Sequence, residues 1–152
     1  TRYADVVSLQ TPYSLLRREL EGPLLETCGE LNLGVLAYEP LCRGLLSGKY
    51  DREPIFPETD LRARDDRFRG GAFNHGQRVS RDLAKLGVRL EVPTTAVAIG
   101  WVCAQPGVTA AIAGARTPDQ VRQNAQGYRF VDQPEAAEVI HKILRRHRRW
   151  RS

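Results

Sequence analysis

Long apolar runs are absent from this sequence. No stretch approaches the roughly 18 to 20 consecutive apolar residues of a membrane-spanning helix. The first residues, Thr1 to Asp5, lack the basic and apolar regions of a signal peptide. We therefore expect no membrane partner and a cytoplasmic location.

Cysteine and histidine are scarce. The three cysteines, Cys28, Cys42 and Cys103, are odd in number and widely spaced, which fits neither a disulfide framework nor a CxxC metal site. The three histidines form no HExxH or similar pair. We therefore expect reduced, mostly structural thiols and no metal site.

Methionine is missing altogether, and all but three of the 23 Lys and Arg residues are Arg. A chain that opens on Thr1 and contains no Met is expected to be a fragment of a longer protein. The composition is otherwise ordinary. With 152 residues, of which 41% are hydrophobic and 27% charged, the chain is predicted to form one domain with its own core.

Short apolar segments predict strands near residues 6–10, 35–38 and 109–113. Helix start and stop signals lie between and after them, and they predict helices at 23–31, 79–86, 94–103, from 117 onward, and at 134–149. Residues 51–74, rich in Pro, Asp, Arg and Gly, are predicted to form a long irregular loop.

The alternation of strands and helices predicts an α/β fold with a parallel sheet and right-handed crossovers. A complete (β/α)8 barrel needs roughly 250 residues, so the chain has room for about three-eighths of one.

Ligands of parallel α/β folds bind beyond the C-terminal ends of the strands. After the third predicted strand, a glycine turn containing Arg116 leads into a helix start. Thr117 is its N-cap, Pro118 its first helical residue, and Gln120 has capping-box spacing. Free N–H groups beside an Arg predict a phosphate site. The alternative is a tight turn next to a solvated Arg.

The second predicted strand ends on Tyr38, and the loop after it contains Pro40, Gly44 and the cations Arg43 and Lys49. Glycine lets a ligand approach the backbone, and cations attract negative charge. This segment predicts either a binding loop or a core strand followed by a turn with surface cations.

Taken together, these segments resemble the C-terminal portion of the aldo-keto reductases. The resemblance covers nearly the whole of 1–152 and rests, in order, on QTPYSLLRRELE (10–21), GVLAYEPLCRGLLSGKY (34–50), FPETDLRARDDRF (56–68) and AIGWVCAQPGVTAAIAGARTPDQVRQNA (98–125). Members of this family are (β/α)8 barrels that transfer a hydride between NADPH and a carbonyl. The resemblance therefore implies a partial barrel made of the sixth, seventh and eighth strands with their helices.

The resemblance also implies residues that bind NADP. Gln10 matches the family's amide at the nicotinamide carboxamide, and Tyr38 matches the aromatic residue that stacks on the nicotinamide ring. The residues matching the loop over the pyrophosphate are Pro40, Leu41, Arg43, Gly44 and Lys49, and Arg62 matches a loop arginine that closes over the cofactor. The residues matching the 2′-phosphate group are Gly114, Arg116 and Gln120, and those matching the adenine pair are Gln123 and Asn124. A guanidinium beside a helix start favours NADP over NAD.

Two residues depart from the family pattern. Glu39 stands where Ser is usual, and a carboxylate facing a pyrophosphate would repel it, so Glu39→Ser is expected to tighten NADP binding. Gln123 stands where Glu is usual, although its amide oxygen can still accept a hydrogen bond from the adenine amine.

The family's catalytic Asp, Tyr, Lys and His belong to the first four strands, and nothing in this chain occupies those positions. Tyr13, Lys49 and His75 lie in the wrong segments to replace them. The chain is therefore expected to hold much of a cofactor site, to contain no catalytic residue, and to be inactive alone. A complete enzyme would need the missing N-terminal half-barrel and a small carbonyl substrate, whose identity the sequence does not select.

Two further hypotheses stay open. A stand-alone half-barrel could bind a nucleotide, or associate with another copy through exposed strand edges, without redox chemistry. The basic run at 145–151 could form a nucleic-acid patch, but a basic helix end also suits the helix dipole. We expect no nucleic-acid partner.

Overall fold

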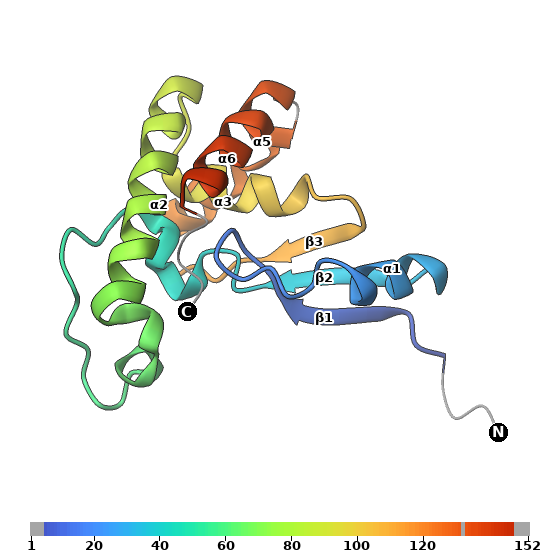
Figure 1. Cartoon of the computed structure of the whole chain (residues 1–152), viewed down its shortest axis with the longest axis horizontal. Helices are drawn as coiled ribbons and strands as arrows, with labels where there is room; N and C mark the ends of the chain where they lie inside the picture. Colours follow the sequence, from blue (N-terminus) through green and yellow to red (C-terminus); the bar gives the residue numbers. More distant parts are fainter. Residues whose placement is uncertain (1–4, 132, 148–152) are drawn as a thin grey trace.

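The computed structural model describes residues 5–131 and 133–147. Figure 1 shows the order of the helices and strands along the chain and their arrangement in space. The elements are β1 (Ser8–Pro12), α1 (Pro23–Glu30), β2 (Gly34–Tyr38), the 3-10 helices η1 (Cys42–Ser47), η2 (Leu61–Arg64) and η3 (Asp66–Phe68), α2 (Gly70–Leu90), α3 (Thr94–Cys103), β3 (Val108–Ile112), α4 (Pro118–Ala125), α5 (Tyr128–Val131) and α6 (Pro134–Arg146).

The three strands that the structure describes form one parallel sheet in the order β1-β2-β3. Figure 1 shows them running in the same direction, toward η1 and α2. A bulge interrupts the β2–β3 ladder between Val35 and Leu36, and the Val35 amide donates to the Thr109 hydroxyl (3.0 Å) at that point. The predicted α/β fold with a parallel sheet is therefore confirmed.

The strand limits differ slightly from the prediction. β1 lies two residues further along than 6–10, because its limits are set by pairing with β2 and not by the β-branched residues that suggested it. Val6 and Val7 are 67% and 75% exposed and precede the ladder. Pro12 is tolerated in β1, which is an edge strand of the sheet formed by the described residues.

The predicted helix at 79–86 was too short, because α2 already starts at Gly70. The irregular segment predicted for 51–74 is accordingly shorter, because η2 begins at Leu61, η3 at Asp66 and α2 at Gly70. Glycine weakens a helical pattern, but Gly76 lets α2 approach η1 closely. A Cβ on Gly76 would lie 2.5 Å from Leu45 Cδ2. The apolar residues that α2 buries are Phe73, Val79, Leu83 and Leu86.

The helices cover one face of the sheet. Val35 and Ala37 of β2 are fully buried, in the core shared with α1 and α3. Side chains alternate along a strand, so Gln10, Tyr38 and Ile112 lie on the opposite face. Gln10 is exposed there, and Ile112 is 43% exposed. Parallel sheets are normally covered on both faces, whereas the described residues cover only one.

α3 is a core helix. Its residues 96–102 are all buried, and Gly100 allows α5 to lie directly against it. A Cβ on Gly100 would be 2.5 Å from the carbonyl oxygen of Gly127 and 2.6 Å from Cβ of Phe130. No single helix in the described ranges is long and apolar enough to cross a membrane. Only α2 and α3 taken together, bent by 94°, reach the required length and composition.

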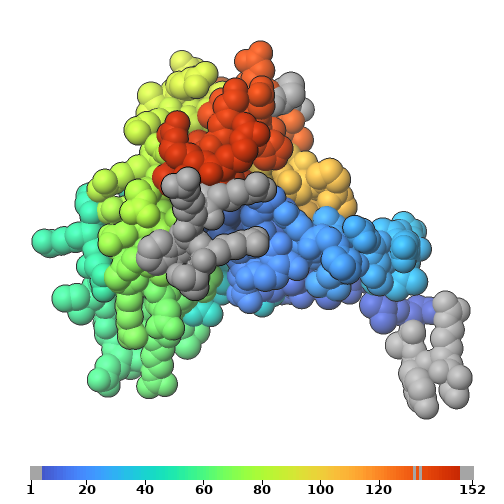
Figure 2. All heavy atoms as spheres, viewed as in Figure 1, coloured from blue at the N-terminus to red at the C-terminus, as the bar shows by residue number. Residues whose placement is uncertain are grey.

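The C-terminal helix α6 ends at Arg146, and the last two residues of the predicted 134–149 lie outside the described part of the chain. α6 packs on α2, where His147 Nε2 lies 3.1 Å from Asp82 Oδ2. In Figure 2, β1 and α1 project to one side of the body that contains α2 and α6.

Candidate functional site

A cavity of about 840 Å³ opens beyond the C-terminal ends of β2 and β3. Segments far apart in the sequence border it: the loop and η1 after β2, residues 59–62, one residue of α3, the turn from β3 into α4, and α4 itself. The residues that line it are Leu41, Arg43, Gly44, Ser47, Lys49, Thr59, Asp60, Leu61, Arg62, Thr95, Gly114, Ala115, Arg116, Gln120, Gln123 and Asn124.

Most of the residues proposed from the sequence meet at this cavity. The predicted residues that line it are Leu41, Arg43, Gly44, Lys49, Arg62, Gly114, Arg116, Gln120, Gln123 and Asn124. Gln10, Tyr38 and Pro40 are not among the lining residues. Gln10 lies inside β1 and not at its end as expected, and Tyr38 is the last residue of β2, on the same open face of the sheet. Pro40 is buried at the start of the loop.

The loop after β2 has an unusual backbone. Glu39, Cys42 and Arg43 all adopt positive φ angles between 47° and 55°, a region that costs free energy for residues other than glycine. Cys42 anchors this loop in the core, fully buried with its thiol 2.9 Å from the Ser14 hydroxyl. Burial raises the pKa of the Cys42 thiol, so it remains protonated as a structural group. Gly44 follows with φ +94°, and a Cβ there would lie 3.3 Å from Lys49 Nζ.

Arg62 is held rigidly on the opposite wall. Its Nε and its backbone N–H both donate to Asp60 Oδ1 at 2.9 Å, and its Nη1 donates to the Tyr50 hydroxyl at 3.1 Å. The guanidinium carbon also lies 4.4 Å from the ring centroid of Phe56. These hydrogen bonds from Arg62 hold the pKa of Asp60 well below its usual range. The paired carboxylate therefore stays ionised, and it offsets part of the positive charge at this wall.

The start of α4 forms the third wall. The Thr117 hydroxyl accepts from the Gln120 N–H (3.3 Å), as the capping pattern predicts, while Gln120 Oε1 accepts from the Arg116 N–H (2.7 Å). This second bond reaches one residue beyond the N-cap. The Arg116 side chain is exposed and has no hydrogen bond or ion pair within the described part of the chain. It is therefore available to an anion in the cavity.

The sequence suggested an unpaired Glu39 carboxylate facing the pyrophosphate, but in the structure this carboxylate is paired. Its carboxylate accepts from Arg43 Nε (2.8 Å) and from Arg67 Nη1 (3.0 Å), and Arg17 Nη1 lies 3.9 Å away. Burial alone would raise the pKa of Glu39, but the hydrogen bonds from Arg43 and Arg67 outweigh it and lower that pKa. The sequence-based picture of simple repulsion is thus corrected, because two guanidinium groups balance this charge.

The ion pairs of Glu39 predict a pH-dependent contribution to stability. Glu39→Gln is expected to lower the free energy of unfolding by about 0.5–1.5 kcal/mol at neutral pH. Because the folded-state pKa is lowered, this contribution is present above the ordinary Glu pKa of about 4.3 and is lost as the pH falls through the lower folded value. Urea unfolding of both proteins between pH 7 and about pH 3 measures it. A difference that stays constant over this range would contradict the prediction.

Sequence reasoning missed several lining residues. The hydroxyl oxygen of Thr95 is buried without a hydrogen-bond partner among the described residues, yet Thr95 borders the cavity. Asp60 could have been found from its residue type, since Asp is a preferred N-cap, and its side chain accepts from the backbone N–H of Arg62 at the start of η2. Nothing in the local sequence around Thr95 shows that α3 reaches this cavity.

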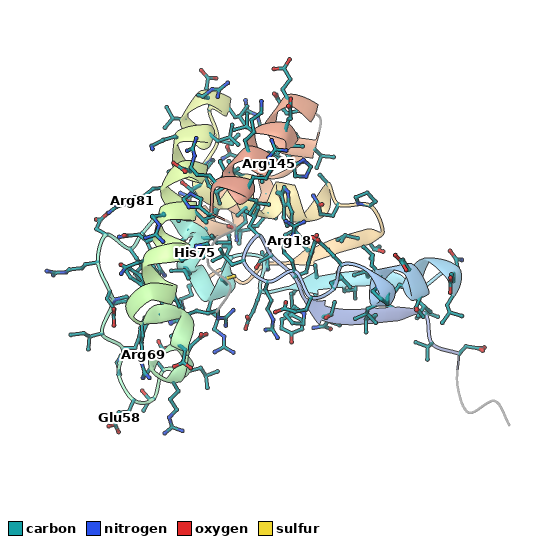
Figure 3. All side chains as sticks on the ribbon, viewed as in Figure 1. Arg18, Glu58, Arg69, His75, Arg81 and Arg145 are labelled. Carbon is teal, nitrogen blue, oxygen red and sulfur yellow. The ribbon has the colours of Figure 1, made fainter. Side chains whose placement is uncertain are left out.

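The side chains considered as substitutes for a catalytic group come from separate elements. Tyr13 is 1% exposed and donates to Glu21 Oε1 at 2.7 Å, and burial raises its pKa above the ordinary range. Lys49 borders the cavity, with Nζ 4.9 Å from the ring centroid of Tyr50. His75 lies on α2, as Figure 3 shows. Tyr13 does not line the cavity that Lys49 borders.

The basic run at 145–151 lies partly outside the described residues. Within them, Arg145 and Arg146 end α6, and Arg146 Nη1 lies 3.4 Å from Asp82 Oδ2. Figure 3 shows Arg145 on α6 and Arg81 on α2, so basic side chains come from both helices. Arg146 therefore has an acidic partner on α2.

Comparison with known proteins adds a family and a fold. The model of the "Aldo/keto reductase family" matches residues 1–145. Aldo-keto reductase YhdN of Bacillus subtilis is 35% identical over 142 residues, which is 93% of this chain and 43% of that protein. The NADH-specific methylglyoxal reductase of Escherichia coli is 28% identical over 123 residues, 81% of this chain and 37% of that protein.

A solved structure, the glycerol dehydrogenase AKR11B4 from Gluconobacter oxydans, superposes with a TM-score of 0.78 at 35% identity. It covers 92% of this chain, and the match spans 42% of that chain. The present chain thus spans less than half the length of these similar proteins.

Proposed function

The chain belongs to the aldo/keto reductase family, and we propose that it is the C-terminal part of an NADP-dependent member that reduces a small carbonyl substrate. The observation that carries this proposal is the cavity, where cations and backbone turns from three distant segments meet beyond the strand ends. The partial match to longer relatives supports a partial barrel, and we assign its strands as the sixth to the eighth.

We assign the α4 wall to the adenosine end of NADP. Arg116 would receive the 2′-phosphate, since its exposed guanidinium lies at the positive end of the α4 dipole, although the N–H groups of Arg116 and Gln120 are already bonded within the cap. Gln120 supports this position by accepting from the Arg116 N–H at 2.7 Å. Gln123 and Asn124, one helical turn further, would contact the adenine.

The loop after β2 and the segment around Arg62 would enclose the pyrophosphate. Lys49 and, beside its partner Asp60, Arg62 supply positive charge there, Arg43 borders the same space with its charge balanced by Glu39 and Asp65, and Gly44 allows close approach of the backbone. Bound NADPH would supply the hydride. Gln10 and Tyr38 would contact the nicotinamide, because they share the open face of the sheet. The proton-donating residues and the strands that cover this face would belong to the rest of the barrel.

The proposal is tested with a ligand that needs only the adenosine end. We expect the 152-residue chain to bind adenosine 2′,5′-bisphosphate about tenfold or more tightly than adenosine 5′-monophosphate, because only the former carries the 2′-phosphate. Isothermal titration calorimetry measures both dissociation constants. Equal affinity for the two nucleotides, or no binding of either, would refute the assignment of this cavity to NADP.

The open face of the sheet favours a second candidate function, a non-catalytic half-barrel that associates with another copy. β1 and β3 are both edge strands among the described residues, and Ile112 is 43% exposed. Unpaired edges favour association with another strand. A monomer in light scattering after size-exclusion chromatography would count against this candidate.

A further inference from the structure

A cluster of four alternating charges joins the two walls of the cavity. Glu39 and Arg43 come from the loop after β2, and Asp65 and Arg67 come from the segment around η3. Glu39 accepts from Arg43 Nε (2.8 Å) and Arg67 Nη1 (3.0 Å). Asp65 Oδ2 lies 2.6 Å from Arg67 Nη2 and 3.3 Å from Arg43 Nη1. We call these four residues the clasp.

The clasp is closed and partly buried. Each carboxylate bridges both guanidinium groups. Arg67 donates two parallel hydrogen bonds to Asp65, of 2.8 and 2.6 Å. The carboxylate side chains are only 18% (Glu39) and 8% (Asp65) exposed, so solvent screens these pairs less than ordinary surface pairs. The charges of the four groups cancel. The clasp therefore fixes geometry without adding net charge to the cavity.

The clasp joins two segments, and each of them contains a residue that borders the cavity. Arg43 borders the cavity itself and has a φ of 54°, a conformation that persists only when its surroundings hold it. Arg62 borders the opposite wall, in the short helix directly before Asp65 and Arg67. The outer part of this segment, marked by Glu58 and Arg69 in Figure 3, lies at the edge of the molecule. Contacts of the clasp therefore join its inner part to the loop after β2, alongside the hydrogen bond of Arg62 to the Tyr50 hydroxyl (3.1 Å) and the buried ring of Phe68.

We propose that Glu39 is a positioning residue: through the clasp it holds Arg43 and the Arg62 segment in place for a pyrophosphate-bearing ligand. The nature of that ligand rests on the proposed function. Simple repulsion predicts tighter ligand binding when the Glu39 carboxylate is removed, and the clasp predicts weaker binding. Removal of the Glu39 carboxylate loosens the wall and weakens binding, although it also removes a negative charge near the site.

Local hydrogen exchange tests the clasp without any ligand. In Glu39→Gln, amides of residues 60–69 are expected to exchange about three- to tenfold faster, while those of α6 are unchanged. Glu138→Gln, which breaks an exposed ion pair with Lys142 (3.3 Å) on α6, is the matched control and leaves residues 60–69 unchanged. Arg67→Lys keeps the charge but loses the paired hydrogen bonds and gives the same direction of effect. Unchanged exchange at 60–69 in both clasp variants overturns the proposal.

Binding measurements then separate positioning from repulsion. Glu39→Gln is expected to weaken NADPH and inorganic pyrophosphate about three- to tenfold, and to leave adenosine 2′,5′-bisphosphate unchanged. Because Glu39 acts partly through Arg43 and partly through Arg67, adding Glu39→Gln to Arg43→Gln is expected to weaken binding by a smaller factor than Glu39→Gln does alone. Tighter NADPH binding by Glu39→Gln overturns positioning. If the unmodified chain binds no NADPH, the proposed function fails, and the exchange result alone upholds or overturns the clasp.

Discussion

Replacing Arg116 by alanine is expected to weaken binding of NADPH and of adenosine 2′,5′-bisphosphate about ten- to a hundredfold, and to leave NADH binding unchanged. The reason is that a phosphomonoester at the start of α4 would lose its charge-assisted hydrogen bonds, which contribute about 1.5–3 kcal/mol. The Arg116 side chain has no hydrogen bond or ion pair among the described residues, so the other interaction that the substitution removes is a longer-range attraction to the Asp60 carboxylate. Titration calorimetry with the three ligands measures the change.

Arg122→Ala is the matched control for Arg116→Ala. Arg122 belongs to the same helix and is also exposed, but its Nη1 is paired with Asp119 Oδ1 at 2.7 Å and it does not border the cavity. It should therefore alter none of the three affinities. An equal loss of NADPH and NADH binding in Arg116→Ala would show that Arg116 contacts a part common to both cofactors and not the 2′-phosphate. A relative named as NADH-specific makes this comparison the decisive one.

Gly100→Ala is expected to lower the free energy of unfolding by about 2–4 kcal/mol. The added methyl group would lie 2.5 Å from the carbonyl oxygen of Gly127, and a backbone atom cannot move aside as a flexible side chain can. Relief of the clash would separate α3 from α5 and expose core around Phe130, which is 2% exposed. Urea unfolding followed by circular dichroism measures the loss.

Gly29→Ala is the control for the glycine substitution. Gly29 also lies inside a helix, α1, but no atom lies within 4 Å of its added Cβ. Alanine there should stabilise the protein by up to about 1 kcal/mol, because it restricts the unfolded chain and favours the helix. If both substitutions destabilised the protein equally, the close approach of α3 and α5 would not be the cause.

Some features of the candidate site can be predicted from residues that are neighbours in the sequence. The start of α4 was predictable because its cap is local: Thr117, Pro118 and Gln120 interact within a few residues. The ends of β2 and β3 were predictable to within a residue for a related reason, since each is a short apolar segment followed by a turn. The sequence therefore suffices to place Arg43, Lys49 and Arg116 near the strand ends.

Other features depended on partners distant in sequence. The length of α2 was underestimated because glycines in a sequence indicate the end of a helix. Only the structure shows that Gly76 lies inside α2, where Leu45 of η1 packs against it. Glu39 looked repulsive because one of its partners, Arg67, lies 28 residues away. The limits of β1 follow from its register with β2 and not from its own β-branched residues.

The sequence by itself therefore determined the family resemblance, the α/β order and the residues that could meet an anion. The tertiary structure alone decided that these residues share one cavity, that Thr95 of α3 belongs to it, and that Glu39 is balanced by two arginines. The physical reason is that propensities, caps and turns act over a few residues. Cavities and ion-pair clusters, by contrast, arise only when the packing of helices on the sheet brings distant segments together.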